Sequence, residues 1–530
     1  MTTLKELQAK VLAGTIGRRD FMRGATALGL SAAAAKVAWP TRAEAAKKGG
    51  HMRVGLAQGS TTDSLDPGSY ENGFTILTSY TAQGKLTVIG SDGELHGDLA
   101  ESWEGLDGAK KWVFKLRDAE FHNSKKVTAN DVVASLNHHR GDDTTSAAKP
   151  ILESVVSLTA DGDKTVVVEL DGGNADFPFI LTDYHLSIGA ADDSGKVDWN
   201  DPDAQSGPYR LAAFDPGVRA LFERADNHWN TAIGHVDAAE VLAILDPVAR
   251  QTALLSDEID VCERPETRTV DRLKQQPGIV VEESTGYRFH SYNMLMDTPP
   301  FDNNDVRLAF KYALDREALV QKALSGHGVV GNDHPITPAY RYYADEIPQR
   351  TYDLDKAKFH LKKAGLSSLD VDLSASSAAY ASAVDAATLY REHAAPAGLN
   401  INVVREPADG YWASVWMKKA FSACDWGGRP TEDQMFSVAY KSGVPWNDTR
   451  FNHERFDKLL IEARSELDDS KRRELYVEMQ KIVHHEGGVI VPMLPNSIWA
   501  RNARVGRAEQ ISSAWQMDGL QLISRWWMES

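Results

Sequence analysis

Short segments of this chain alternate between hydrophobic and polar residues, as β-strands do when one face is buried. Residues 51–57, 112–116 and 165–170 follow this pattern and contain many β-branched or aromatic side chains, which is typical of strands. Other segments repeat their apolar residues with the period of a helix. Between residues 304 and 313 the apolar positions lie at i, i+3, i+4 and i+7, which predicts a helix with one buried face.

Several predicted helices also have a clear first residue. Thr128, Asp315 and Asp353 each directly precede a helical pattern and are candidate N-caps. An apolar stripe over residues 475–483 predicts another helix behind the cap cluster 468–470. Short strands and helices mixed along the whole chain favour an α/β or α+β fold over a pure helical bundle or β-sandwich.

The length and composition fit a large globular protein. The chain has 530 residues, of which 42% are hydrophobic and 25% are charged, and such a length suggests about three domains. Asp and Glu (75) outnumber Lys and Arg (58), for a formal net charge of −17. A surface this acidic repels nucleic acids and anionic lipids, so we expect neither as a partner.

The first 45 residues have the features of an export signal in the right order. Arg18 and Arg19 precede an apolar stretch of small residues over 24–38, and residues 43–45 fit a small-x-small cleavage site. The apolar stretch is too short to span a bilayer comfortably. We interpret residues 1–45 as a twin-arginine (Tat) signal peptide, which places the mature chain in the periplasm.

Residue types used in catalysis and metal binding form no convincing motif. Residues 326–331 fit G-x-G-x-x-G, but they follow a predicted helix, whereas a dinucleotide site follows a strand. We expect a helix stop and a flexible loop there. The pairs His138-His139 and His484-His485 are adjacent, and neighbours on a helix point about 100° apart, so we expect surface histidines rather than metal ligands.

The two cysteines, Cys262 and Cys424, leave two alternatives open. Export to an oxidising compartment permits a disulfide between them. Two buried free thiols are the other alternative.

One region is unusually rich in aromatic residues with polar groups between them. Such a region is either a ligand pocket with apolar walls and a few oriented charges or a hydrophobic core with a solvated rim. The aromatic residues are Tyr411, Trp412, Trp416, Phe421, Trp426, Phe436, Tyr440 and Trp446.

A series of short segments, in a fixed order, matches the motifs of one known family. The segments are 64–67 (SLDP), 99–103 (LAESW), 112–117 (WVFKLR), 121–132, 206–209 (SGPY), 254–260 (LLSDEID), 300–317 and 472–492. Single matches are weak, but the ordered series covers nearly all of the mature chain. On these motifs the chain resembles the extracellular solute-binding proteins of family 5, the dipeptide-, oligopeptide- and nickel-binding components of ABC importers.

The resemblance implies an α/β, two-lobed periplasmic binding protein fold of type II, with a hinge and an extra inserted domain. It places the first lobe at about residues 46–75, 207–284 and 498–530, the inserted domain at about 76–206 and the second lobe at about 285–497. A ligand would lie between the lobes and would be enclosed when they close.

The resemblance also implies candidate site residues. Peptide-binding members place a Trp-containing segment with a downstream Asp beside the α-amino group of the peptide. In the matching segment 425–433, Asp433 is the first candidate for an amine anchor and Trp426 for a pocket wall. Arg429 departs from the family pattern, and its guanidinium is a forked donor for a carboxylate or phosphate. Candidates of lower rank are Tyr411, Tyr440, Tyr292, Asn293 and Gln58.

A free dipeptide is a poor candidate for the ligand. Dipeptide binders carry a carboxylate-binding Arg near the segment that corresponds to residues 374–380, and that segment contains no Arg here. Arg429 would have to take over that role.

These observations predict a periplasmic receptor that captures a small polar solute, such as a peptide, an amino-acid derivative or an opine-like compound, and delivers it to the permease subunits of an ABC importer. We expect a monomer with no cofactor and no enzymatic activity. One alternative is a receptor for nickel or a metal chelate within the same family. A second alternative is an exported enzyme, because Tat substrates often fold with a cofactor before export.

Overall fold

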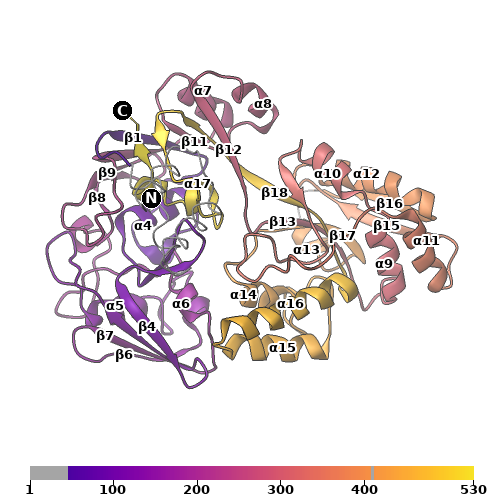
Figure 1. Ribbon diagram of the computed structural model, residues 1–530, viewed down its shortest axis with the longest axis horizontal. Coiled ribbons are helices and arrows are strands. Elements are labelled where there is room, and N and C mark those ends of the chain that lie inside the picture. Colours follow the sequence, from indigo (N-terminus) through magenta and orange to yellow (C-terminus); the bar gives the residue numbers. More distant parts are fainter. Residues whose placement is uncertain (1–45, 408–410, 530) are drawn as a thin grey trace, which may run out of the picture.

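A computed structural model describes residues 46–407 and 411–529 (Figure 1). The interpreted signal peptide, residues 1–45, lies outside the described residues. Two lobes lie at opposite ends of the long axis of the molecule, and the N- and C-terminal segments are both in the first lobe (Figure 1). The two-lobed α/β architecture expected from the resemblance is confirmed.

One 12-stranded sheet runs through both lobes. The strands of the second lobe come first in the sheet order, and those of the first lobe follow. Ten of its strands follow one another in the order β16 (Leu399–Arg405), β15 (Leu369–Ala375), β17 (Phe421–Trp426), β13 (Phe289–Met294), β18 (Val489–Asn502), β11 (Val261–Glu263), β1 (His51–Leu56), β10 (Ala238–Ala243), β9 (Arg219–Arg224) and β8 (Tyr209–Asp215). The other two, β12 (Ile279–Thr285) and β14 (Gly328–Val330), each pair with β18.

Strand β18 belongs to both lobes. Its first part pairs with β13 of the second lobe, where Asn293 lies opposite Val489. Its last part pairs with β12 (Ile279–Thr285) over seven residue pairs, from Thr285–Asn496 to Ile279–Asn502. The short segment 286–288 between β12 and β13 is the second crossing, so two adjacent stretches of chain connect the lobes.

The segment that we expect to form the inserted domain, residues 76–206, contains a separate sheet. Its four strands are β4 (Ala100–Leu106), β5 (Lys111–Leu116), β7 (Thr165–Leu170) and β6 (Val155–Ala160). Trp112, Phe114 and Leu116 alternate along β5 and are buried, as the hydrophobic pattern predicts. Helix α5 (Ala129–Asn137) covers this sheet, and α6 (Phe177–Ile180) adds Phe177 to the same core.

Two groups of helices build the second lobe. The group α9 (Asn304–Tyr312), α10 (Arg316–Ala323), α11 (Leu354–Lys363) and α12 (Ala383–Ala394) shares a core with β15 and β16. The other group has a separate core and lies beside the inserted domain (Figure 1). Its members are α14 (Glu432–Ala439), α15 (Glu454–Ser465) and α16 (Asp469–Glu486).

The predicted N-caps are confirmed. Asp315 accepts a hydrogen bond from the backbone N–H of Ala318, and Asp353 accepts one from Lys356. At the start of α5, the Asp131 carboxylate accepts from both the backbone N–H and the hydroxyl of Thr128, which closes a capping box.

Three sequence expectations need correction or completion. Residues 328–330 form a short strand, β14 (Gly328–Val330), which pairs with β18, so this part of the expected flexible loop is ordered by the sheet. His139 and His484 are buried rather than at the surface, because each lies where its helix packs against a loop. The His139 ring forms a hydrogen bond with the hydroxyl of Ser146, and the His484 ring donates to the carbonyl of Asn332. Cys262 and Cys424 are both free and buried, in β11 and β17 respectively.

Among the described residues, no helix is both long and apolar enough to cross a membrane.

Candidate functional site

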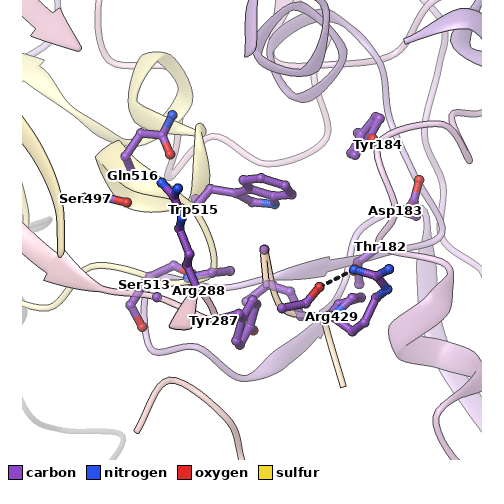
Figure 2. Close-up of a pocket in the computed structure, with 18 of the residues that line it drawn as sticks. Thr182, Asp183, Tyr184, Tyr287, Arg288, Arg429, Ser497, Ser513, Trp515 and Gln516 are labelled. Atoms are coloured by element: carbon purple, nitrogen blue, oxygen red, sulfur yellow. Dashed lines mark hydrogen bonds between the residues drawn. The ribbon is translucent and has the colours of Figure 1, made fainter. Parts of the chain in front are cut away.

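A cavity of about 1000 Å³ lies where the two lobes and the inserted domain meet. Figure 2 shows Thr182, Asp183 and Tyr184 of the inserted domain facing Ser497, Trp515 and Gln516 across it, with Tyr287 and Arg288 between them. Tyr287 and Arg288 belong to the second crossing between the lobes, and Ser497 belongs to β18, so two cavity walls are parts of the hinge. A cavity of this size accommodates a small solute with much of its surface buried.

Aromatic side chains line the cavity on several sides. The rings of Tyr184 and Trp515, which come from opposite walls, lie edge to face with their centroids 6.5 Å apart, and Trp515 is 43% exposed. On another side, the ring of Tyr287 lies 4.5 Å from that of Tyr340. Exposed aromatic faces of this kind bind flat or apolar parts of a ligand.

The carboxylate of Asp425 is neutralised inside the protein. It accepts hydrogen bonds from Arg288 Nε at 3.0 Å and from His290 Nδ1 at 2.8 Å. Burial alone would raise the pKa of Asp425, but the hydrogen bonds and charges of His290 and Arg288 lower it below its usual value. Asp425 and Arg288 therefore contribute no net charge to the cavity.

Two other charged residues of the cavity also have partners. Arg264 forms an ion pair with the buried Glu263 at 3.2 Å. The same Glu263 carboxylate accepts from the backbone N–H of Ala57 and from Gln516 Nε2. In the inserted domain, Asp183 Oδ1 lies 2.7 Å from His185 Nδ1.

Arg429 differs from the other cationic residues of the cavity. Its guanidinium lies over the rings of Trp426 and Trp446, 5.6 Å and 5.7 Å from their centroids, and donates to the carbonyl oxygen of Gly428 at 2.6 Å (Figure 2). Within the described part of the chain, no carboxylate forms an ion pair with it. Burial lowers the pKa of Arg429 from its usual value, since the protein supplies no anion to compensate for lost hydration.

A glycine turn positions Arg429. Gly428 has a φ of +75°, and a Cβ atom at this residue would lie 2.3 Å from the Cβ atom of Tyr287. Both the left-handed conformation and the close approach require glycine. The backbone N–H of Arg429 then donates to the hydroxyl of Tyr340 at 3.1 Å, which fixes the turn after β17.

The structure brings one of the eight sequence-predicted site residues, Arg429, to the lining of this cavity. Asp433 does not line it: its carboxylate accepts from Arg464 Nε at 3.0 Å and is 8% exposed. Trp426 lies behind Arg429, and its indole N–H donates to Asp448 at 2.9 Å.

The other five candidates also lie outside the lining of this cavity. The hydroxyl of Tyr411 donates to the carbonyl of Ala423, and Asn293 Nδ2 donates to Asp448. The Gln58 side chain accepts from the backbone N–H of Gly73 at the start of α4 (Gly73–Ala82). Tyr292 and Tyr440 are buried in the two cores of the second lobe.

Several lining residues are absent from the sequence prediction. Asp183, Tyr184, Tyr287, Arg288 and Trp515 come from segments that are far apart in the chain. The predicted lobe boundary near residue 285 is the one available signal, because a hinge between lobes also borders the cleft between them. No group of three or more His, Cys, Asp or Glu side chains in residues 46–407 and 411–529 is arranged to hold a metal ion.

The model of the bacterial extracellular solute-binding proteins, family 5, matches residues 94–448. The chain belongs to this family. Proteins of the family are solute-binding receptors of ABC importers, and the mixed α/β fold and the cavity between the lobes fit that role.

Two further comparisons place the chain among characterised proteins. It is 25% identical to the dipeptide-binding protein of Escherichia coli (strain K12) over 522 residues, which cover 84% of this chain and 93% of the relative. The structure of HbpA2 from Haemophilus parasuis aligns with a TM-score of 0.80 at 21% identity, covering 89% of this chain and 99% of that one.

A second solved structure with the same fold contains a ligand. AgaA from A. tumefaciens R10, in complex with agropinic acid, aligns with a TM-score of 0.67 at 22% identity and covers 91% of this chain and 99% of that one.

Proposed function

We propose that this protein is a monomeric periplasmic receptor, exported through its twin-arginine signal, that captures a small polar solute in the cavity between its lobes. It presents the loaded form to the permease subunits of an ABC importer. The observation that carries this proposal is the cavity itself, which draws its walls from the two lobes, the inserted domain and the hinge. A solute that touches all of these walls favours one relative orientation of the lobes.

The classes of solute follow from the walls and from the named relative. Aromatic faces together with charged side chains suit a peptide, an amino-acid derivative or an opine-like compound. The relationship to a dipeptide-binding protein supports the first two classes. No step of this function requires bond chemistry, so the protein acts by binding and release.

The proposal is tested by a thermal-shift screen of the mature chain, residues 46–530. The panel contains peptides, amino acids, opines, polyamines, sugars and nickel chelates. A solute that binds the folded state alone raises the melting temperature by mass action. If no compound raises it, and mass spectrometry of the denatured protein finds no co-purified solute, the receptor function is wrong.

Export and assembly state need their own measurements. Replacing Arg18 and Arg19 together with lysines is expected to leave the protein in the cytoplasm of its host, whereas the unchanged chain is recovered from the periplasm.

Size-exclusion chromatography with light scattering is expected to give the mass of one chain. A stoichiometric cofactor in the purified protein would instead support an exported enzyme.

A further inference from the structure

The charges around the cavity identify the chemical class of its solute. We infer that the solute is an organic anion whose carboxylate pairs with Arg429 and whose body lies against the aromatic walls. This inference rests on the proposed receptor function and narrows it to one kind of ligand.

The acidic side chains of the cavity already have hydrogen-bond partners within the protein. Asp425 is bound by both Arg288 and His290. Asp183 is bound by His185. It also raises the pKa of the buried Lys85, which burial lowers to about 8, so a cation lies within electrostatic range of this carboxylate. A cationic solute would find both oxygens of Asp425 already bonded, and at Asp183 it would compete with His185.

Arg429, in contrast, forms no ion pair with any carboxylate of the described residues. Its guanidinium has five N–H donors, and the acceptor it uses in the described structure is the carbonyl oxygen of Gly428. The Trp426 and Trp446 rings beneath it contact the guanidinium with their π faces but carry no negative charge. A carboxylate from the solute would give the fork two charge-assisted hydrogen bonds and restore charge balance.

The carboxylate that was expected to bind an ammonium group is already paired within the protein. Asp433 is the residue that the family resemblance suggests for an α-amino group, and its carboxylate is held by Arg464. Arg464 is fixed in turn, because its Nη2 donates to the hydroxyl of Ser437. A free peptide would bring its ammonium to this side of the cavity without a carboxylate partner, so the structure favours solutes whose amine is blocked or absent.

A carboxylate fits this site better than a phosphate does. Phosphate sites usually combine several donors, often from the free N–H groups at a helix N-terminus. Here α14 begins at Glu432, three residues after Arg429, and one of its first N–H groups, that of Gln434, already donates to the N-cap Thr431 at 3.2 Å. One forked cation is suited to a single negative charge.

The first test uses four probes that share an aromatic body and differ in charge. They are N-acetyl-L-phenylalanine (an anion), N-acetyl-L-phenylalaninamide (neutral), 2-phenylethylamine (a cation at pH 8) and phenyl phosphate (mainly a dianion at pH 8). Calorimetry on the mature chain at pH 8 is expected to show the carboxylate binding at least tenfold more tightly than each of the others. Equal or tighter binding of the neutral or cationic probe overturns the inference, and tighter binding of phenyl phosphate makes the solute a phosphate.

Variants then connect the preference to Arg429. Arg429→Gln is expected to weaken binding of the carboxylate at least tenfold, and Arg429→Lys less, because a lysine retains the charge but loses the fork. Arg455→Gln is the matched control, since Arg455 pairs with Glu478 at the surface, away from the cavity. Its affinity should stay within twofold of the wild type. If Arg429→Gln also stays within threefold, the inference is wrong.

A second measurement separates the failure of this inference from failure of the receptor function. The mature chain is incubated with a dialysable cell extract, re-isolated and denatured, and the retained solutes are identified by mass spectrometry. Acidic solutes that Arg429→Gln does not retain support the inference. Neutral or cationic solutes overturn it but leave the receptor function intact, and the absence of any retained solute overturns both.

Discussion

The carboxylate of Asp176 lies 2.6 Å from the guanidinium of Arg472, and both side chains are at most 5% exposed. Asp176 is the N-cap of α6 in the inserted domain, whereas Arg472 belongs to α16 of the second lobe. Beside this pair, the backbone N–H of Ala175 donates to the carbonyl of Arg464 at 2.7 Å. The inserted domain is thus bonded to the second lobe at a point that is separate from the hinge.

Removing one partner of this pair should be costly. Arg472→Met leaves the Asp176 carboxylate buried without its cation, and we expect the free energy of unfolding to fall by about 3–5 kcal/mol. Urea unfolding at pH 7 measures the loss. The double variant Asp176→Asn, Arg472→Met should recover part of it, since the unpaired charge is gone. If Arg472→Met and Asp176→Asn each lose less than 1 kcal/mol in unfolding free energy, this account is wrong.

Glu432 should make the stability depend on pH. Burial raises its pKa to about 7, with the nearby Asp176 adding to this shift and the hydrogen bond from the Tyr342 backbone N–H and the charge of Arg472 opposing it. The unfolded chain loses this proton near pH 4.5, so between about pH 4.5 and 7 the native state binds more protons. Stability therefore falls as the pH rises through this window and is level above it.

The variant Glu432→Gln isolates that effect. Glutamine keeps an acceptor oxygen for the Tyr342 backbone but cannot ionise. We expect the variant to match the wild type near pH 4 and to be more stable at pH 8, as measured by urea unfolding across the range. Parallel pH profiles for the two proteins would show that Glu432 does not titrate in this way.

Asp448 should hold two tryptophans in place, and one of them, Trp426, lies beneath Arg429. Its Oδ2 atom accepts from Trp416 Nε1 at 3.0 Å, Trp426 Nε1 at 2.9 Å and Asn293 Nδ2 at 2.6 Å. Asp448→Ala removes the acceptor of these three donors, and we expect a loss of about 2–4 kcal/mol in unfolding free energy with a shift in tryptophan emission. Asp448→Asn keeps an acceptor oxygen and should lose less. An unchanged emission spectrum in Asp448→Ala would rule out this positioning role.

The two cysteines should be unreactive in the native protein. Cys262 and Cys424 are buried and free, and burial raises the pKa of Cys262 to about 12 and that of Cys424 well above its usual value. Thiolates, which are the reactive form, are therefore scarce. Ellman's reagent should label neither residue at pH 8 until urea is added and should then label both. Labelling of the folded protein at the rate of free cysteine would contradict this.

Local sequence patterns predict much of this fold. The strand near residue 51 and the helices capped by Asp315 and Asp353 are read from alternation, period and N-cap residues, all of which depend on neighbours in the chain. Strand β14 has no such local pattern, because its place in the sheet comes from pairing with β18, which is more than 150 residues later. Buried His484 is likewise explained by a distant partner, the carbonyl of Asn332.

The site is less predictable than the fold, for the same physical reason. Asp433 and Arg429 lie four residues apart, and the family resemblance suggests that both face a ligand. In the structure, helix α14 starts at Glu432 and carries Asp433 to Arg464 on α15, whereas the turn at Gly428 leaves Arg429 in the cavity wall. Sequence spacing does not show which of two neighbouring charged residues is paired within the protein and which remains available to a ligand. That depends on partner residues far away in the chain.

The path of β18 also determines when the first lobe can be completed during synthesis. Strand β11 pairs with β1 on one side and with β18 on the other, and Trp499 and Trp526 lie in the same core as Val54. These tryptophans leave the ribosome only after the whole second lobe has been made. Until β18 emerges, β11 of the nascent chain has no partner strand on that side, and the first lobe has an unpaired sheet edge. The N-terminal half of the chain therefore cannot complete the sheet of the first lobe by itself.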